Sequence, residues 1–304
     1  MTKADDEPRD AGATGGGARD DGAPGGRAPG GGDAPAAAGG PPPLTRAQVD
    51  EIAKERGLEL VRTAEADRRL ALLWESPAPR SRGRRPRLSL DEVVEAGIAV
   101  AREDGLDALS MRRVAQRLDV GAMSLYTYVP GRTELVDLMI DRAYAGLDLP
   151  AAGEPWRTGL QRYARAFWDL FHAHPWLLQA NLWRAPLAPH VLDAQEAGLR
   201  TIIDTGLPPE RVVDLIGMVD NYVRGLARAD IAEVLERERT GQDYDTYWAS
   251  LSSFWEDYFD VERYPTMTRI WAAGGFEHET GGLDDALERL LDAVESAIER
   301  ATSS

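Results

Sequence analysis

Residues 110–132 restrict the fold of this chain most strongly, because two short apolar repeats flank a turn there. The first repeat follows the spacing of one helical face, with apolar residues at Met111, Val114, Ala115 and Leu118. Ser110 precedes it with a hydroxyl that can cap the first turn. Residues 119–121 interrupt the pattern, and 122–129 resume it. The stretch therefore predicts two short helices joined by a tight turn.

The second repeat predicts a helix with a polar and aromatic outer face. Leu125 and Val129 are expected to point inward, which leaves Met123, Ser124, Tyr126, Thr127 and Tyr128 outside. Small, hydroxyl-bearing and aromatic side chains can contact base edges in a major groove. The alternative is a structural helix pair, because two helices around a turn also occur in proteins that do not bind DNA.

Residues 89–147 resemble the DNA-binding domain of the tetracycline repressor (TetR) family of bacterial transcriptional regulators, above all over 109–118 and 123–135. The resemblance combines a helix cap, a helix-turn-helix and a following helix start in one register. It implies an all-α protein, with an N-terminal three-helix helix-turn-helix domain and a C-terminal helical domain for ligand binding and dimerisation. Asp119 departs from the family, where glycine is common, but aspartate tolerates a left-handed conformation.

The resemblance also implies which residues contact double-stranded DNA. These are Arg112, Arg113, Ala122, Met123, Ser124, Tyr126, Thr127, Tyr128 and Arg132. The hydroxyls and Arg132 suit phosphate, whereas Met123 and Thr127 can contact thymine methyls. Arg112 can pair with a guanine edge. Arg113 is the alternative, because a rotation of the helix by one residue would put Arg113 in the place of Arg112.

Composition divides the N-terminal part into three segments. Residues 1–43 contain no Val, Ile, Leu, Phe, Trp or Tyr but hold 12 of the 30 glycines, so we expect a disordered tail. Residues 44–79 predict a helical extension that Gly57 divides. It lies outside the family pattern, and it could pack on the DNA-binding domain, bind another protein or be partly unfolded alone.

A basic arm over residues 80–88 precedes the helix-turn-helix domain. It is rich in arginine, and we expect Arg84 and Arg85 to contact phosphates or an adjacent minor groove. A solvated linker is the alternative. Although the net charge is −16, residues 80–130 sum to +2 and residues 131–304 to −14, which would orient the positive end toward DNA.

Composition also narrows the functional class. The chain has no cysteine, so disulfides and thiolate metal sites are excluded, and we expect no metal and no cofactor. No apolar run is long enough to cross a bilayer, which predicts a soluble, cytoplasmic protein without membrane contact. No combination of nucleophile, base and orienting group stands out, so an enzyme is disfavoured.

Residues 148–304 predict the regulatory and dimerisation domain. A helix over 209–238 is apolar on more than one face, and a helix over 283–301 has an apolar stripe. In the TetR family the corresponding helices form a four-helix dimer interface. We therefore expect a homodimer through 209–238 and 283–301 that reads an inverted repeat. The alternative is a last helix that packs only on its own chain.

The same domain contains candidates for a ligand site. The expected lining residues are Phe167, Phe171, Asn181, Trp183, Asp220, Asn221, Tyr222, Trp248 and Trp255. Their chemistry suits an unidentified small, apolar or aromatic ligand, whereas plain core packing is the favoured alternative for each aromatic side chain taken alone. Asn181 aligns where the tetracycline repressors have a histidine, which argues against a tetracycline–magnesium complex.

His172 and His174 lie two residues apart on a predicted helix and should diverge, so they do not indicate a metal site. A rival interpretation within the same class is a regulator without a small ligand, controlled by a protein partner through residues 45–75.

Overall fold

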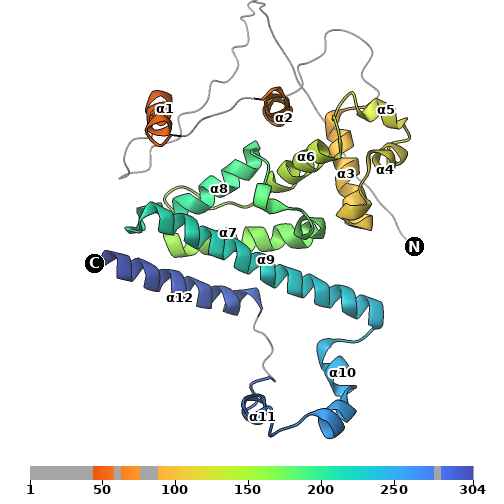
Figure 1. Ribbon diagram of the computed structural model, residues 1–304, viewed down its shortest axis with the longest axis vertical. Helices are drawn as coiled ribbons and strands as arrows, with labels where there is room; N and C mark the ends of the chain where they lie inside the picture. Colours follow the sequence, from red (N-terminus) through yellow and green to blue (C-terminus); the bar gives the residue numbers. More distant parts are fainter. Residues whose placement is uncertain (1–43, 58–62, 76–87, 277–281, 304) are drawn as a thin grey trace, which may run out of the picture. The chain divides into compact units, whose positions relative to one another are not determined.

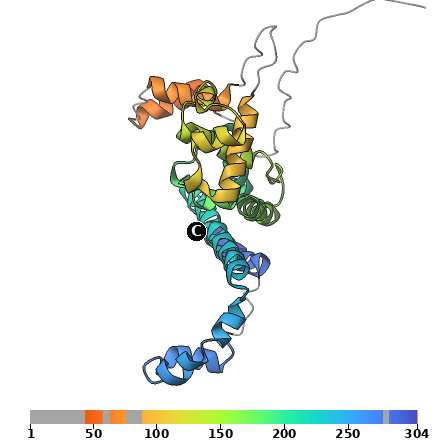
Figure 2. The same cartoon turned by 90° about the vertical axis from the view of Figure 1, so that its right-hand side faces the viewer.

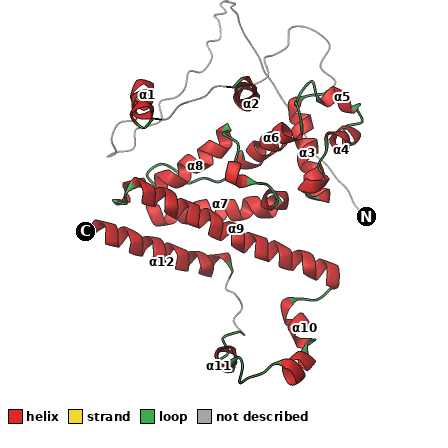
Figure 3. Cartoon of the chain, viewed as in Figure 1, coloured by secondary structure: helices red, strands yellow, loops and turns green. Residues whose placement is uncertain are grey.

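The computed structural model describes residues 44–57, 63–75, 88–276 and 282–303 (Figure 1). The secondary structure within these ranges is helical, as Figure 3 shows, and this confirms the expected all-α class. The tail 1–43 and the arm arginines Arg84 and Arg85 lie outside the described residues, so the predictions made for them remain predictions.

The N-terminal extension forms two helices, α1 (Arg46–Glu55) and α2 (Ala64–Trp74). Thr45 caps α1, and Gly57 has a φ of 65° just after it, which fits the predicted division at this glycine. Neither helix has a buried residue, but α2 packs against α6.

Helices α3 (Leu90–Asp104), α4 (Met111–Arg117), α5 (Ala122–Leu125) and α6 (Arg132–Tyr144) form what we call the head. The hydroxyl of Ser89 accepts a hydrogen bond from the backbone N–H of Glu92, whose carboxylate accepts one from the N–H of Ser89. This capping box fixes where α3 begins, and Gly105, with a φ of 82°, ends it.

The body contains α7 (Trp156–Ala173), α8 (Pro189–Ile202), α9 (Pro209–Thr240) and α12 (Leu283–Thr302). α7 packs against α8, α9 and α12, and α12 lies beside α9 in both views (Figures 1 and 2). The apolar stripe of α12 is buried against its own chain through Leu287, Leu290, Leu291 and Val294. The stripe thus contributes to the core of its own chain.

Residues 241–276 connect α9 to α12 through α10 (Tyr244–Ala249), a π-helical turn (Phe254–Tyr258) and α11 (Pro265–Ala272). Residues 244–259 do not form one continuous helix, because α10 ends at Ala249 and the chain turns before Phe254. No residue of this segment is buried. Among the described helices, none is both long and apolar enough to cross a membrane.

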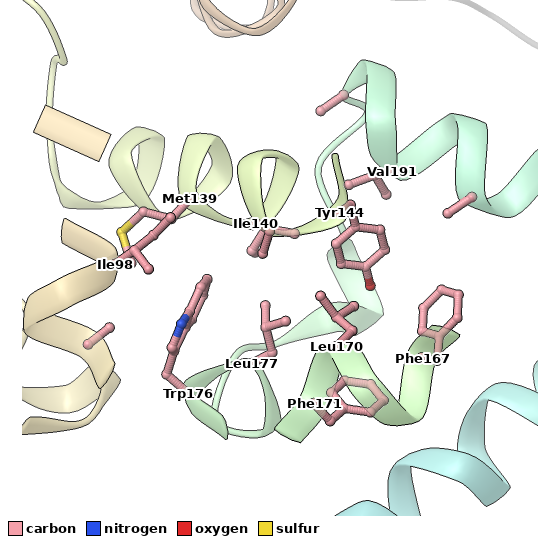
Figure 4. Packing of buried hydrophobic residues seen from close by; sticks show 14 of the residues in the cluster. Ile98, Met139, Ile140, Tyr144, Phe167, Leu170, Phe171, Trp176, Leu177 and Val191 are labelled. Atoms are coloured by element: carbon pink, nitrogen blue, oxygen red, sulfur yellow. The ribbon is translucent and has the colours of Figure 1, made fainter. Parts of the chain in front are cut away.

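Head and body meet around Trp176, which lies in a short 3₁₀ helix (Pro175–Leu178) after α7. Its ring is 1% exposed and lies against Ile98 and Met139 of the head (Figure 4). Nearby, Oε1 of Gln179 accepts a hydrogen bond of 2.8 Å from the backbone N–H of Leu106. One continuous core therefore includes both parts, so a shift of the α7 end can be transmitted to the head.

Candidate DNA-binding surface and ligand site

The turn before α5 sets the direction of the recognition helix. Asp119 has a φ of 52°, the left-handed conformation that we predicted for this position, and the N–H of Val120 donates to the carbonyl of Ala115 at 3.0 Å. Leu125 and Val129 are both 0% exposed, so they hold this segment on the core as expected. The opposite face of α5 is thereby turned to solvent.

The helix predicted over 122–129 is shorter in the structure, because α5 ends at Leu125 and residues 126–128 form a turn. The outer face of α5 and this turn together present four of the predicted contact residues. Met123 is 78% exposed and Tyr126 47% exposed, and Ser124 and Thr127 are also exposed. The hydroxyl of Thr127 donates to the carbonyl of Ser124 at 2.7 Å, so its methyl group remains for apolar contact. Two other residues predicted to contact DNA, Ala122 at the start of α5 and Tyr128 in the turn after it, are half-buried and pack against the core.

The predicted arginines differ in how they are held. Arg112 is exposed, and Arg113, also exposed, forms an ion pair of 3.3 Å with Asp104. Arg132 donates from Nε to the carbonyl of Leu109 at 2.9 Å and from Nη2 to that of Leu106 at 2.8 Å. Arg132 therefore ties the turn after α3 to the start of α6. This structural role of Arg132 could not be predicted from sequence, because it depends on the fold of residues 105–110.

Phe167 and Phe171 lie on one face of α7 in the centre of the body (Figure 4). The ring of Tyr144 meets Phe167 edge-on at 5.6 Å between centroids, and the ring of Tyr163 lies 4.8 Å from Phe167. All four rings are buried, so they form an aromatic group within the otherwise aliphatic core, with Tyr144 contributed by α6. We call these four residues the aromatic core.

Polar side chains from α9 border the aromatic core. The Tyr163 hydroxyl donates to Oδ1 of Asp220 at 3.0 Å, and the Arg224 guanidinium lies 5.2 Å from the centre of the Phe171 ring. Burial raises the pKa of Asp220 to about 6, against the opposing effects of the Tyr163 hydrogen bond and the charge of Arg224. A carboxylate, a guanidinium and aromatic rings therefore occur together.

Sequence analysis missed Tyr144, Tyr163 and Arg224 in this group. Tyr163 precedes Phe167 by one helical turn, and Arg224 follows Asp220 by one turn, so the i, i+4 spacing carried a usable signal for both. Tyr144 ends α6 in another part of the chain and could not be placed from spacing alone.

The other predicted ligand residues are not brought to the aromatic core. Asn181 is exposed, and Asn221 is exposed with its amide donating to the carbonyl of Gly217 at 2.8 Å. Trp248 and Trp255 lie 6.1 Å apart and are 38% and 43% exposed, in a separate aromatic cluster of residues 241–276. Tyr222 is half-buried against the body core, and the Trp183 side chain lies outside the described residues.

The two neighbouring histidines have different surroundings, as their spacing suggested. Nε2 of His172 lies 2.8 Å from Asp230, whereas burial lowers the pKa of His174. In the described part of the chain, no group of three potential metal ligands comes together. A groove of about 340 Å³ along α7 is lined largely by polar and charged side chains, including Arg162 and Arg165, and by none of the predicted ligand residues.

Comparison with known proteins assigns both parts of the chain. Residues 93–139 match the family model described as bacterial regulatory proteins, tetR family, and residues 149–298 match the tetracyclin repressor-like C-terminal domain. The HTH-type transcriptional repressor DrrR1 of Streptomyces coeruleorubidus is 40% identical over 230 residues, which are 75% of this chain and 85% of the relative. The chain belongs to the TetR family. This regulator is therefore a DNA-binding transcription factor.

More distant relatives agree with this assignment. The class E tetracycline repressor protein of Escherichia coli is 26% identical over 159 residues, which are 51% of this chain and 72% of the relative. The Streptomyces coelicolor TetR family protein ActR, solved in complex with actinorhodin, has a TM-score of 0.57 at 25% identity. That match covers 69% of this regulator and 95% of ActR. Helices α1 and α2 lie outside both family-model regions.

Proposed function

We propose that this TetR family regulator is a homodimeric repressor that binds an inverted repeat through α5 and releases it when a small aromatic ligand binds the body. The observation that carries the DNA-binding part is the exposed surface of α5 and the turn after it, where Met123 and Tyr126 lie on either side of buried Leu125. The proposal also places the protein in the cytoplasm, where its DNA is.

We assign one kind of DNA contact to each exposed residue of the DNA-binding surface. Met123 and the Thr127 methyl contact thymine methyls, whereas the hydroxyls of Ser124 and Tyr126 donate to phosphate. Arg112 pairs with a guanine edge, because Arg113 is already engaged with Asp104. We assign Arg132 to the head's internal structure and not to phosphate, since its Nε and Nη2 both donate to backbone carbonyls.

The ligand is proposed to enter the aromatic core. A planar aromatic molecule can replace ring–ring contacts of Phe167 and Phe171 without loss of apolar burial. Asp220 offers an acceptor and Arg224 a donor on the same side of α9, so the ligand should bear a hydroxyl group and a carbonyl or acidic oxygen. The complex of ActR with actinorhodin supports a small-molecule ligand for this fold.

A second copy of the chain is proposed to cover α9. Val213 and Met218 are 59% and 39% exposed on this helix. A Cβ added at Gly217 or Gly225, two helical turns apart, would meet nothing within 4 Å, so a partner helix can approach closely there. Because the α12 stripe is used inside one chain, the contribution of 283–301 must come from outward residues such as Ala293.

The test is a mobility shift with the full chain and a labelled duplex of the DNA flanking its own gene. We expect a salt-sensitive shift that unlabelled copies of the duplex abolish and unrelated DNA does not. 1,8-Dihydroxyanthraquinone, which carries both hydroxyl and carbonyl groups, should reverse the shift at lower concentration than anthracene, which has neither. Equal binding to the flanking duplex and to unrelated DNA would refute the proposed operator. Equal potency of the two compounds would refute the proposed roles of Asp220 and Arg224 in binding the ligand.

A further inference from the structure

Helix α2 lies outside the family pattern but carries the partner of an unusual buried charge. Asp137 of α6 is 5% exposed, and it is the one charged residue among those described that is fully buried. Its Oδ2 accepts a hydrogen bond of 2.5 Å from Nε of Arg69. A buried carboxylate without a partner is strongly destabilising, so Arg69 of α2 offsets the cost of burying Asp137 in α6.

A second contact attaches the end of α2 to the body. Nε1 of Trp74 donates to the carbonyl of Leu187 at 2.8 Å, and Leu187 lies just before α8 begins at Pro189. The neighbouring Leu73 packs against the hydrophobic core. α2 therefore spans from α6, the last helix of the head, to the start of α8 in the body.

Helix α6 is held at two further points close to this contact. The carboxylate of Asp141 accepts a hydrogen bond of 2.8 Å from the backbone N–H of His190, and its other oxygen lies 2.8 Å from Nδ1 of that residue. Arg142 pairs with Glu95 of α3 at 3.2 Å and also with Asp91. The position of α6 is thus set by the head, by α8 and by α2 together.

We propose that α2 is an intramolecular strap, in which Arg69 and Trp74 position α6 against the body and narrow the range of head positions. α6 belongs to the head and packs on α8, so movement between these helices moves the DNA-reading surface. A strap across them favours one arrangement over others by the free energy of its contacts. The proposal rests on the DNA-binding role of the head but not on the identity of a ligand.

The test compares Arg69→Gln with Arg68→Gln in the full chain. Arg68 is the adjacent, exposed arginine, and its Nε donates only within α2, to the carbonyl of Ala64. We expect Arg69→Gln to speed amide hydrogen exchange in α6 about tenfold and Arg68→Gln to leave it unchanged. Equal exchange in both variants would overturn the strap, and this measurement needs no DNA.

A double-mutant cycle separates positioning from general loss of stability. Asp137→Asn removes the buried charge, so adding Arg69→Gln in that background should have little further effect on α6 exchange. Additive effects of the two substitutions would contradict the pairing. Trp74→Phe, which removes only the donor to Leu187, should give a smaller increase in α6 exchange and keeps the test decisive if Arg69→Gln unfolds.

Operator affinity provides the functional measurement. The duplex that gives the mobility shift is titrated by fluorescence anisotropy, well below the unfolding temperature of each variant. We expect Arg69→Gln to weaken binding several-fold relative to Arg68→Gln, because a wider range of head positions lowers the DNA-competent fraction. Faster α6 exchange with unchanged operator affinity would refute the proposed effect of the strap on the position of the head. If the wild type gives no mobility shift, the proposed operator is refuted, and the exchange result alone decides the strap.

Discussion

The Tyr163 hydroxyl and the Asp220 carboxylate, 3.0 Å apart, join α7 to α9 at the centre of the body. Tyr163 is 2% exposed, and its ring lies against Gly198 of α8, where a side chain would overlap it. The same contact thus serves packing and places a carboxylate beside the aromatic core. Substitutions at Asp220 and at Gly198 can separate the role of this contact in placing the carboxylate from its role in packing.

Asp220→Asn should change how stability depends on pH. Burial raises the pKa of Asp220 to about 6 from 3.8, so the folded chain holds this proton more tightly than the unfolded chain. The contribution of Asp220 to stability is therefore favourable below the pKa of this group in the unfolded chain. It is lost as pH rises through the pKa of the group in the folded chain. Relative to wild type, we expect Asp220→Asn to gain about 1–3 kcal/mol in unfolding free energy between about pH 4 and pH 7.5.

Urea denaturation at both pH values measures this difference. Comparison with the wild type at each pH cancels the other titrating groups, including His174, whose lowered pKa acts in the opposite sense. A stability difference that is the same at both pH values would show that Asp220 is not perturbed in the folded chain.

Gly198→Ala should destabilise the body. A Cβ at this position would lie 2.8 Å from Cε2 and Cζ of the Tyr163 ring, and that ring is buried. Relieving the overlap requires the ring or α8 to shift, at a cost of about 1–3 kcal/mol. Thermal unfolding should show a lower midpoint than for Gly146→Ala, where the added Cβ meets nothing within 4 Å. Equal midpoints would mean that α8 yields without cost.

Gly217→Glu should weaken the proposed dimer. It places a charged side chain on the outer face of α9, in the space that a close partner helix would need. Sedimentation velocity should show a shift toward monomer, by about tenfold or more in dissociation constant. Gln195→Glu on the exposed surface of α8 makes the same change in charge and should leave the dimer intact. If the Gly217→Glu and Gln195→Glu dimers are equally stable, the dimer interface does not include this face of α9.

The head could be predicted from sequence because its signals are local. The Ser89 capping box, the left-handed Asp119 and the apolar spacing of α4 each depend on residues within a few positions of one another. The resemblance to the TetR family then gave the arrangement of these helices. Local chemistry and fold agree here, which is why the predicted helix positions hold to within a few residues.

The ligand site was predicted less well because it depends on tertiary contacts. Aromatic content alone suggested Trp248 and Trp255, but these lie on a segment with no buried residue, whereas Tyr144 reaches the core from another helix. The stripe of α12 has the same ambiguity, since an apolar face does not reveal whether its partner belongs to the same chain. The docking of α2 also depends on a pair 68 residues apart in sequence.

Tyr126→Ala and Arg132→Ala should separate DNA contact from head stability. Tyr126 is 47% exposed, so its truncation should leave the melting temperature and the dimer unchanged while the mobility shift is lost at wild-type binding concentrations. Arg132→Ala removes two hydrogen bonds to the carbonyls of Leu106 and Leu109, so it should lower stability by about 1–3 kcal/mol. If Tyr126→Ala still binds operator normally, α5 does not read DNA in the way proposed, because no other substitution on this face removes as large an exposed hydroxyl-bearing ring.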